Sequence, residues 1–357
     1  MTKLTTPQPA RHWAPTTKAQ RLAYLVWERP DLDQTENFLN AFGLVTAERR
    51  SDALFLRPAQ ALPFCYVVHR GEQARFVGLA LEMGDRADLE QLAQLPGAST
   101  IEALDTPGGG EVVRLRDPAG FAVEAVYGQA PYTALPVRDH LVANSGDAQP
   151  RVNAGQRPAI AAPDILRLGH VVLELANFQE VCGWYTRHFG LIPSDVQVLD
   201  DGSPLITFLR LDRGQTPSDH HTLALAQGLV DGFSHCAFEV PDLDAVGVGQ
   251  RVLYDGGYRH AWGIGRHLLG SQIFDYWEDP SGFKHEHYAD GDVFTSDVAT
   301  GVSLAGPASL SQWGPPLPPE FIRPKPSLEL LTGAIRNLIQ SPDLSLRKLL
   351  AMIRLAG

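Results

Sequence analysis

The sequence contains few cysteines, no long apolar run and no excess of basic residues. Its three cysteines (Cys65, Cys182 and Cys236) are widely spaced and odd in number, which disfavours a disulfide framework and suits a reducing cytoplasm. No segment approaches the roughly 18 apolar residues of a membrane span, and the first residues lack the apolar core of a signal peptide. A formal net charge of -11 disfavours nucleic-acid binding, because phosphates require basic partners. We therefore expect a cytoplasmic protein that acts on a small molecule, with no nucleic-acid or membrane partner.

A length of 357 residues suits two domains, each with a sizeable core. Residues 1–16 are expected to be a tail, and residues 131–164, which mix Pro, Gly, Ala, Asn and Asp without periodicity, a linker. Residues 293–357 form a C-terminal extension that is expected to be partly helical, because two apolar patterns at helical spacing occur in it and break at Ser341-Pro342. This extension either covers the mouth of a site or builds an oligomer interface.

The chain contains an internal repeat. Three kinds of segment occur twice: a strand followed by an amphipathic helix, a middle strand, and a DP turn followed by a strand. The pairs are RLAYLVWERPDLDQTENFLNAFG (21–43) with RLGHVVLELANFQEVCGWYTRHFG (167–190), FVGLALEM (76–83) with FSHCAFEV (233–240), and DPAGFAVEAVYG (117–128) with DPSGFKHEHYADG (279–291). We infer that two copies of one unit occupy residues 17–130 and 165–292.

Each copy divides again into two modules. In the second copy a strand-then-helix pattern begins at Arg167 and begins again near Gly232. Modules of one strand, one helix and three strands can pair into a curled, open sheet around a cavity. The predicted fold class is therefore α+β, with two domains of two βαβββ modules each.

Histidine is distributed unevenly between the two copies. Of the twelve histidines, nine lie between residues 165 and 292, whereas the first copy contains only His69. A core does not need histidine, because a buried imidazole must find hydrogen-bond partners, but a metal site does need it. The second copy is therefore the candidate for a metal centre.

Strand alternation selects among these histidines, because successive residues of a strand face opposite sides. His170 in RLGHVVLEL and His235 in FSHCAFEV each sit on one face of a separate strand. In FKHEHYA, Glu286 faces one side, whereas His285 and His287 face the other. Either the glutamate or the two histidines can point into the cavity, but not all three.

The internal repeat decides between these alternatives. Aligning DPSGFKHE on DPAGFAVE places Glu286 on Glu124 and His285 on Val123. The first copy thus keeps the glutamate position and lacks the histidine, so we assign Glu286 to the cavity. His285 and His287 are then expected on the outer face, where the C-terminal extension covers them.

The first copy lacks the two histidines. His170 aligns with Tyr24, and His235 aligns with Gly78. The metal site is therefore expected only in the second copy, with His170, His235 and Glu286 as ligands. Two imidazoles and one carboxylate leave coordination positions open, which is the arrangement of oxygen-activating Fe(II) sites. Mn(II) can occupy the same ligands and is the second choice.

These residues and their surroundings resemble a known family. The segment GRHLLGSQIFDYWEDPSGFKHE (265–286) is similar to the signature region of the type I extradiol dioxygenases of the vicinal oxygen chelate superfamily. Residues 165–292 resemble the catalytic domain of these enzymes, and residues 17–130 resemble their non-catalytic N-terminal domain. The resemblance implies cleavage of a catechol-type ring with O2, giving a ring-opened semialdehyde-type product.

The resemblance also implies roles for residues that alternation cannot assign. HHTLAL (220–225) places His221 at the position of the family's acid-base histidine. Within residues 265–286, His267 and Tyr276 stand at the positions of groups that orient the substrate. The neighbouring His220 takes the place of His221 if the strand register slips by one residue.

Two other functions remain possible at this point. The fold also supports isomerases of the glyoxalase type, lyases and hydrolases, whose ligands generally come from both paired halves, which Tyr24 and Gly78 disfavour. Metal-free binding proteins of this fold lack the ligand histidines that this chain retains. Whatever the chemistry, we expect a homo-oligomer.

Overall fold

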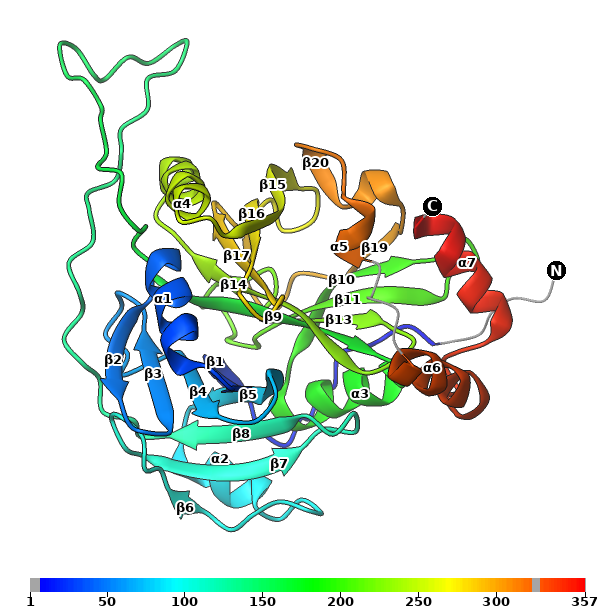
Figure 1. The fold of residues 1–357 in the computed structure, drawn as a ribbon. Coiled ribbons are helices and arrows are strands. Elements are labelled where there is room, and N and C mark those ends of the chain that lie inside the picture. Colours follow the sequence, from blue (N-terminus) through cyan, green and yellow to red (C-terminus); the bar gives the residue numbers. More distant parts are fainter. Residues whose placement is uncertain (1–6, 323–327, 357) are drawn as a thin grey trace.

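The computed structural model describes residues 7–322 and 328–356, and it divides the chain into two sheets joined by a long linker (Figure 1). Residues 19–127 form an eight-stranded sheet, and residues 167–313 provide a ten-stranded one. Both sheets are mixed and curled, with helices on their outer sides. The predicted α+β fold class is confirmed.

The N-terminal half consists of two consecutive βαβββ modules. The elements of the first module are β1 (Ala19–Arg29), α1 (Leu32–Phe42), β2 (Val45–Arg49), β3 (Ala53–Arg57) and β4 (Tyr66–Arg70). Those of the second are β5 (Arg75–Met83), α2 (Arg86–Leu92), β6 (Glu102–Ala103), β7 (Glu111–Arg116) and β8 (Ala122–Tyr127).

The C-terminal half repeats this order. Its first module contains β9 (Arg167–Leu175), α3 (Phe178–Phe189), β10 (Ile192–Val198), β11 (Pro204–Arg210), the short β12 (Ser218–Asp219) and β13 (Leu223–Gln227). Its second contains β14 (Gly232–Glu239), α4 (Leu243–Asp255), β15 (Arg259–His267), β16 (Ile273–Glu278) and β17 (Lys284–Ala289).

Strand pairing shows that the two halves are structural copies. In each half the first strands of the two modules are antiparallel neighbours, β1 with β5 and β9 with β14. Tyr24 pairs with Ala80 of β5, as His170 pairs with Ala237 of β14. The sequence alignment of Tyr24 with His170 is therefore confirmed in three dimensions.

Local signals explain where the helices begin and end. The Asp31 side chain accepts a hydrogen bond from the backbone N–H of Gln34 and so caps the first turn of α1. The same helix ends at Gly43, whose φ of 114° is a left-handed conformation that glycine adopts without a steric penalty. Asp242 caps α4 through the backbone N–H of Ala245.

The two halves pack against each other through the outer face of the strand that carries Glu286. His285 and His287 lie on that face, opposite to Glu286 as predicted, but the N-terminal half covers them rather than the C-terminal extension. The Tyr66 hydroxyl lies 3.0 Å from Nε2 of His285, and Nε2 of His287 donates to the Phe42 carbonyl oxygen at 2.7 Å. Our assignment of the cover was therefore wrong. The rings of Phe38 and Phe42 from the first copy pack against His285 and His287 and supply the apolar cover.

The C-terminal extension completes the second sheet at both edges. It contains β18 (Val293–Phe294), β19 (Gly301–Leu304), a 3-10 turn (Pro307–Ser309), β20 (Ser311–Trp313), α5 (Pro319–Ile322), α6 (Leu328–Gln340) and α7 (Leu346–Ala356). Strand β19 pairs with β10, and β20 pairs with β15. The two helices on either side of Ser341-Pro342 are confirmed, whereas the two edge strands were not predicted.

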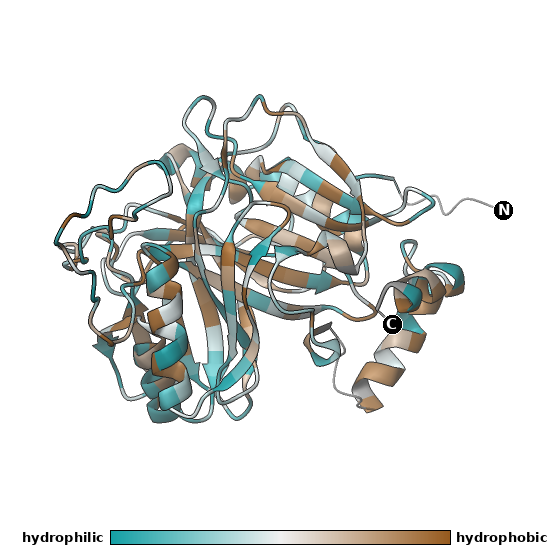
Figure 2. Ribbon diagram, turned by 90° about the horizontal axis from the view of Figure 1, so that it is seen from above, coloured by the Kyte–Doolittle hydropathy of each residue, from teal (hydrophilic) through white to brown (hydrophobic). Residues whose placement is uncertain are grey.

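The last two helices are anchored on one side and exposed on the other. Ser341 donates to the Ala176 carbonyl oxygen, and the Lys348 ammonium donates to the Gln227 side chain at 2.8 Å. The outward sides of α6 and α7 carry brown, apolar residues in Figure 2. The exposed large aliphatic side chains there are Leu328, Leu331, Ile335, Ile339, Leu346, Leu350 and Ile353. No helix in the described part of the chain is long and apolar enough to span a membrane.

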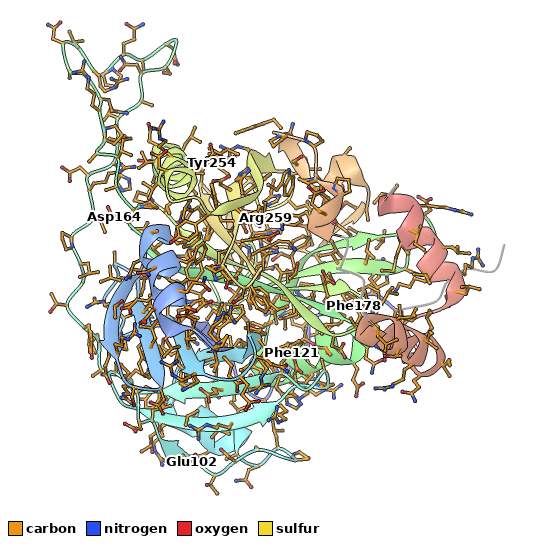
Figure 3. All side chains as sticks on the ribbon, in the orientation of Figure 1. Glu102, Phe121, Asp164, Phe178, Tyr254 and Arg259 are labelled. Carbon is orange, nitrogen blue, oxygen red and sulfur yellow. The ribbon has the colours of Figure 1, made fainter. Side chains whose placement is uncertain are left out.

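The linker between the halves has no regular structure. Between Tyr127 and Arg167 the chain forms neither helix nor strand, and it extends away from both sheets (Figure 1). Its side chains project from the body of the molecule, up to Asp164 where it returns (Figure 3). The first part of the linker is nevertheless tied to the N-terminal sheet, because the Arg57 guanidinium donates to the Thr133 carbonyl oxygen and the backbone N–H of Leu135 donates to the Ala59 carbonyl oxygen.

Candidate metal centre

Three neighbouring strands place the predicted ligands side by side. His170 lies on β9, His235 on β14 and Glu286 on β17, with β14 in the middle. Ala237 of β14 is the register partner of both His170 and Glu286, so these two side chains flank the same point of the central strand. His235 lies two residues before Ala237 and therefore faces the same side.

The three side chains converge within bonding distance of one ion. Glu286 Oε2 lies 3.2 Å from His170 Nε2 and 3.6 Å from His235 Nε2. One ligand atom from each residue lies within 4.8 Å of the others, and no other group of three such residues occurs in the described part of the chain. Coordination of this kind suits a divalent ion with open positions.

The carboxylate of Glu286 shows that a cation fits here. Its side chain is 0% exposed, yet neither oxygen accepts a hydrogen bond of normal geometry from any described residue. A buried carboxylate without hydrogen bonds is costly unless a positive charge balances it. A divalent ion between Glu286, His170 and His235 removes that cost.

The protonation states of the ligands also suit a metal. Burial alone raises the pKa of Glu286, but the nearby imidazoles of His170, His267 and His235 outweigh burial and lower this pKa. Burial lowers the pKa of His235 to about 3, despite the opposing charge of Glu286. At neutral pH the site therefore offers an ionised carboxylate and a neutral imidazole with a free lone pair, the forms that bind metal.

His221 lies beside the metal ligands. Its ring centroid is 4.1 Å from that of His170. Burial, together with the neighbouring His170 and His220, lowers the pKa of His221 well below its usual value. The ring is therefore neutral at neutral pH. Of the two adjacent histidines, His221 is the one in ring contact with a ligand, whereas His220 lies behind it, 3.0 Å away between the two Nδ1 atoms.

His267 and Tyr276 form a hydrogen-bonded pair on the other side of the site. Nδ1 of His267 lies 2.8 Å from the carbonyl oxygen of Leu310, which can only accept, so this nitrogen carries the proton. Nε2 of His267 lies 2.9 Å from the Tyr276 hydroxyl oxygen, and in the tautomer protonated at Nδ1 it accepts from this hydroxyl. Burial and the charge of Glu286 raise the pKa of Tyr276 well above 10, which keeps the phenol protonated.

The C-terminal extension contributes a wall of the site through residues that the sequence analysis did not single out. The Phe321 ring of α5 packs 4.9 Å from Tyr276 and 5.4 Å from Trp262. The Lys284 ammonium lies 4.6 Å above the same ring. Together with the Leu310 carbonyl, these contacts show that the extension covers one side of the site. An aromatic residue within a Pro-rich segment was the available signal.

The equivalent position in the N-terminal half holds a closed polar pair instead of a site. The Tyr24 hydroxyl donates to Glu124 Oε2, and Nε of Arg114 donates to Glu124 Oε1. Both oxygens of this glutamate are thereby satisfied by the protein itself. A side chain at Gly78 has no room, because its Cβ would lie 1.9 Å from the Ala122 carbonyl oxygen. The prediction that only the second copy forms a metal site agrees with these contacts.

Two paired βαβββ domains with a two-histidine, one-carboxylate site in the second define a metal-dependent protein of the vicinal oxygen chelate fold. The profile of the Glyoxalase/Bleomycin resistance protein/Dioxygenase superfamily matches residues 167–286. Metapyrocatechase 2 of Cupriavidus necator is 33% identical over 308 residues, which cover 83% of this chain and 89% of that protein. The chain therefore belongs to this superfamily and, within it, to the type I extradiol dioxygenases.

Solved structures show the same fold. An extradiol ring-cleaving dioxygenase from B. fuscum superposes with a TM-score of 0.73 at 19% identity, covering 90% of this chain and 87% of the other. A Mn(II)-bound glyoxalase from Novosphingobium aromaticivorans superposes with a TM-score of 0.71 at 23% identity, covering 87% and 96%. At these identities the likeness concerns the fold alone, so the chemistry must be argued from the site.

Proposed function

We propose that this chain cleaves a catechol-type aromatic ring with O2 at an Fe(II) ion held by His170, His235 and Glu286. The observation that carries the proposal is the convergence of His170 and His235 on the buried carboxylate of Glu286, which accepts no hydrogen bond of normal geometry from the described residues. Relatedness to metapyrocatechase 2 supports the same reaction class. The product is a ring-opened semialdehyde or a related acid.

The metal and the protein have separate tasks. Fe(II) held by the three side chains would offer open positions to both catechol oxygens and O2, and would pass electrons from the catechol to O2, so that the ring is oxidised and both oxygen atoms enter the product. The strands supply the geometry, because β9, β14 and β17 hold the ligands in fixed rotameric directions. Since the site is unable to form in the first half, residues 17–130 have a structural role and residues 165–292 the catalytic one.

His221 is proposed to move the proton. A catechol hydroxyl that approaches the ligands meets the neutral imidazole of His221, which is in contact with His170. The free ring nitrogen accepts this proton and later returns it to the product, the role of a general acid-base group. His220 is not proposed for this step, because His221 separates it from the ligands.

Tyr276 and His267 are proposed to orient the substrate. The Tyr276 proton is held by His267, so the phenolic oxygen keeps its lone pairs and accepts a hydrogen bond from a substrate hydroxyl. Tyr276 also lies 5.1 Å from His235, between ring centroids, which places it beside the metal. Its position therefore fixes which edge of the ring faces the ligands.

The protein is also proposed to assemble from several copies. Seven large aliphatic side chains on α6 and α7 are exposed in the single chain, and contiguous apolar patches on a monomer usually mark a contact. Light scattering of the purified protein measures the number of copies directly. A single-chain mass would contradict this part of the proposal.

The central experiment combines metal analysis with oxygen consumption. Protein purified without air is expected to contain near one iron per chain, to take up O2 when catechol is added, and to form the yellow ring-fission product. Metal-free protein reloaded with Fe(II) or Mn(II) tells which ion supports turnover. Iron-loaded protein that consumes no O2 with any of a panel of substituted catechols would refute the proposed function.

A substitution separates metal binding from proton transfer. His221→Asn is expected to keep the iron, because residue 221 is not a ligand, and to lose most of the turnover. The expected loss is about 100-fold or more, the usual contribution of a general acid-base group. If the variant lost its iron instead, the assignment of His221 would be wrong.

A further inference from the structure

Two buried polar residues continue behind His221, away from the metal ligands. Nδ1 of His221 lies 3.0 Å from Nδ1 of His220, and Nε2 of His220 lies 2.7 Å from Oδ2 of Asp195 on β10. Both histidines are almost completely buried. The proposed function uses His221 alone and leaves His220 and Asp195 without a role.

The direction of each hydrogen bond follows from Asp195. A carboxylate can only accept, so the Nε2–H of His220 is the donor in that contact. When His220 carries this single N–H, its Nδ1 has a lone pair and accepts from Nδ1–H of His221. The proton of His221 is then fixed on Nδ1, and Nε2 of His221 keeps its lone pair.

We propose that Asp195 and His220 are positioning residues that hold His221 in the tautomer whose Nε2 can accept a proton. The inference rests on the proposed function, in which His221 takes the proton of a catechol hydroxyl. In the opposite tautomer Nε2 carries hydrogen and cannot accept, although the ring occupies the same place. The chain of hydrogen bonds Asp195–His220–His221, called the relay below, therefore selects the tautomer of His221 as well as the orientation of its ring.

The surroundings of His220 hold its ring in this relay. Phe208 packs 5.3 Å from the ring of His220 and 5.1 Å from that of His221, and Phe294 of β18 packs 5.5 Å from His220 on another side. The backbone N–H of His220 donates to the Asp292 carbonyl oxygen at 2.9 Å. Because both rings are enclosed by aromatic neighbours, neither can rotate to a different partner without disturbing the core.

Asp195 is fixed by the first edge strand of the extension. It pairs with Gly301 of β19, and a Cβ on Gly301 would lie 2.0 Å from Oδ1 of Asp195. Glycine at this position therefore leaves the space that the carboxylate fills. The Asp195 side chain is 18% exposed, so the carboxylate is partly in contact with solvent.

The direct test is the tautomer itself. In metal-free protein, the nitrogen-15 shifts of the His221 ring, assigned by their disappearance in His221→Asn, are expected to show Nδ1 protonated and Nε2 unprotonated. In Asp195→Asn the amide can donate to His220 and reverse the relay, so the His221 ring is expected to populate the opposite tautomer. An Nε2–H form of His221 in the unaltered protein, or no change in Asp195→Asn, would overturn the proposal. This readout does not depend on turnover, so it remains decisive if the protein fails to cleave catechol.

Steady-state kinetics with catechol and iron-loaded protein provide a matched pair of variants. Gln at position 220 can accept from His221 through its oxygen and donate to Asp195 through its nitrogen, whereas Leu can do neither. His220→Leu is expected to lower kcat about 10- to 100-fold with KM and iron content nearly unchanged, and His220→Gln to recover most of that loss. Equal losses in the two variants, or none in His220→Leu, would overturn the proposal. If His220→Leu fails to hold iron, Asp195→Asn decides by the same split between kcat and KM.

Discussion

The guanidinium of Arg29, at the end of β1, donates to the carboxylate of Asp279 at 2.9 Å across the boundary between the two halves. The two side chains are only 1% and 3% exposed. The other oxygen of Asp279 accepts the backbone N–H groups of Ser281 and Phe283, which shapes the turn before β17. The first half thereby fixes the turn that precedes Glu286, although it holds no metal itself.

Removal of one member of this buried pair is expected to be costly. Arg29→Met leaves the Asp279 carboxylate buried without its cation, so the free energy of unfolding should fall by about 3–5 kcal/mol. The exposed pair of Arg75 and Glu28 is the matched control, and Arg75→Ala should cost less than about 1 kcal/mol. Urea unfolding of metal-free protein measures both. Equal losses for the two variants would show that burial of the Arg29 pair has no importance.

Metal content distinguishes the inner from the outer face of β17. His235→Ala should lose its iron, because only two of the three ligands, His170 and Glu286, remain to hold the ion. His285→Gln should keep near one iron per chain. Its free energy of unfolding should fall by about 1–3 kcal/mol, because the buried hydrogen bond between residue 285 and the Tyr66 hydroxyl is disturbed. Metal analysis after anaerobic purification and urea unfolding check the two expectations. Iron-free His285→Gln would show that the register of β17 is misassigned.

A pH dependence of stability is expected from Asp117, which occupies in the first half the place of Asp279. The Tyr185 hydroxyl of α3 donates to its Oδ2 at 3.0 Å, again across the boundary. Burial raises the pKa of Asp117 to about 6, and the hydrogen bonds from Tyr185 and the Phe121 N–H offset burial only in part. Since the folded pKa exceeds the unfolded one, the folded state holds the proton more tightly, and stability falls as pH rises from about 4 through about 6.

Asp117→Asn removes this titration while keeping an oxygen for the backbone donors. Relative to the unaltered protein, the variant should gain on the order of 2 kcal/mol in unfolding free energy between pH 4 and pH 7.5. Urea unfolding of metal-free protein at both pH values measures the change. A difference that stays constant with pH would show that Asp117 titrates normally.

The closed state of the first half can be tested at Gly78. Gly78→Ala brings a methyl group against the Ala122 carbonyl oxygen and should cost about 2–4 kcal/mol, because backbone atoms must move apart. Gly232→Ala, at the start of β14 where nothing lies within 4 Å of the added carbon, is the control and should change stability by less than about 0.5 kcal/mol. Thermal or urea unfolding compares the two. An unchanged free energy of unfolding in Gly78→Ala would mean that β5 and β8 move apart at little cost.

Much of the fold was predictable because its information is local and repeated. The two-residue alternation of strands and the duplication give the modules, and each half confirms the alignment of the other. Strands β19 and β20 were not predictable, since GVSL and SQW are too short to show an alternating pattern and become strands only where the curled sheet presents a free edge. The same reasoning applies to His285, because alternation gives the face of a residue but not what covers that face.

The site divides in the same way. His170, His235 and Glu286 could be predicted because all three are distinctive side chains on strands whose facing is known. Asp195 could not, since it lies in IPSDVQV at a position that also suits an ordinary surface carboxylate. Phe321 lies more than 30 residues beyond the last ligand in a segment without periodicity, so only the folded chain brings it to Tyr276.

The contact between His267 and Leu310 has a consequence for variation in the extension. The atom of Leu310 that fixes the His267 proton is a main-chain oxygen, which every amino acid possesses. Replacement of this leucine by another residue can therefore leave the chemistry intact, whereas insertion or deletion of one residue between β19 and β20 shifts the carbonyl away. The extension contributes to the site through the number of residues between β19 and β20. The same few residues should therefore tolerate substitution but not insertion or deletion.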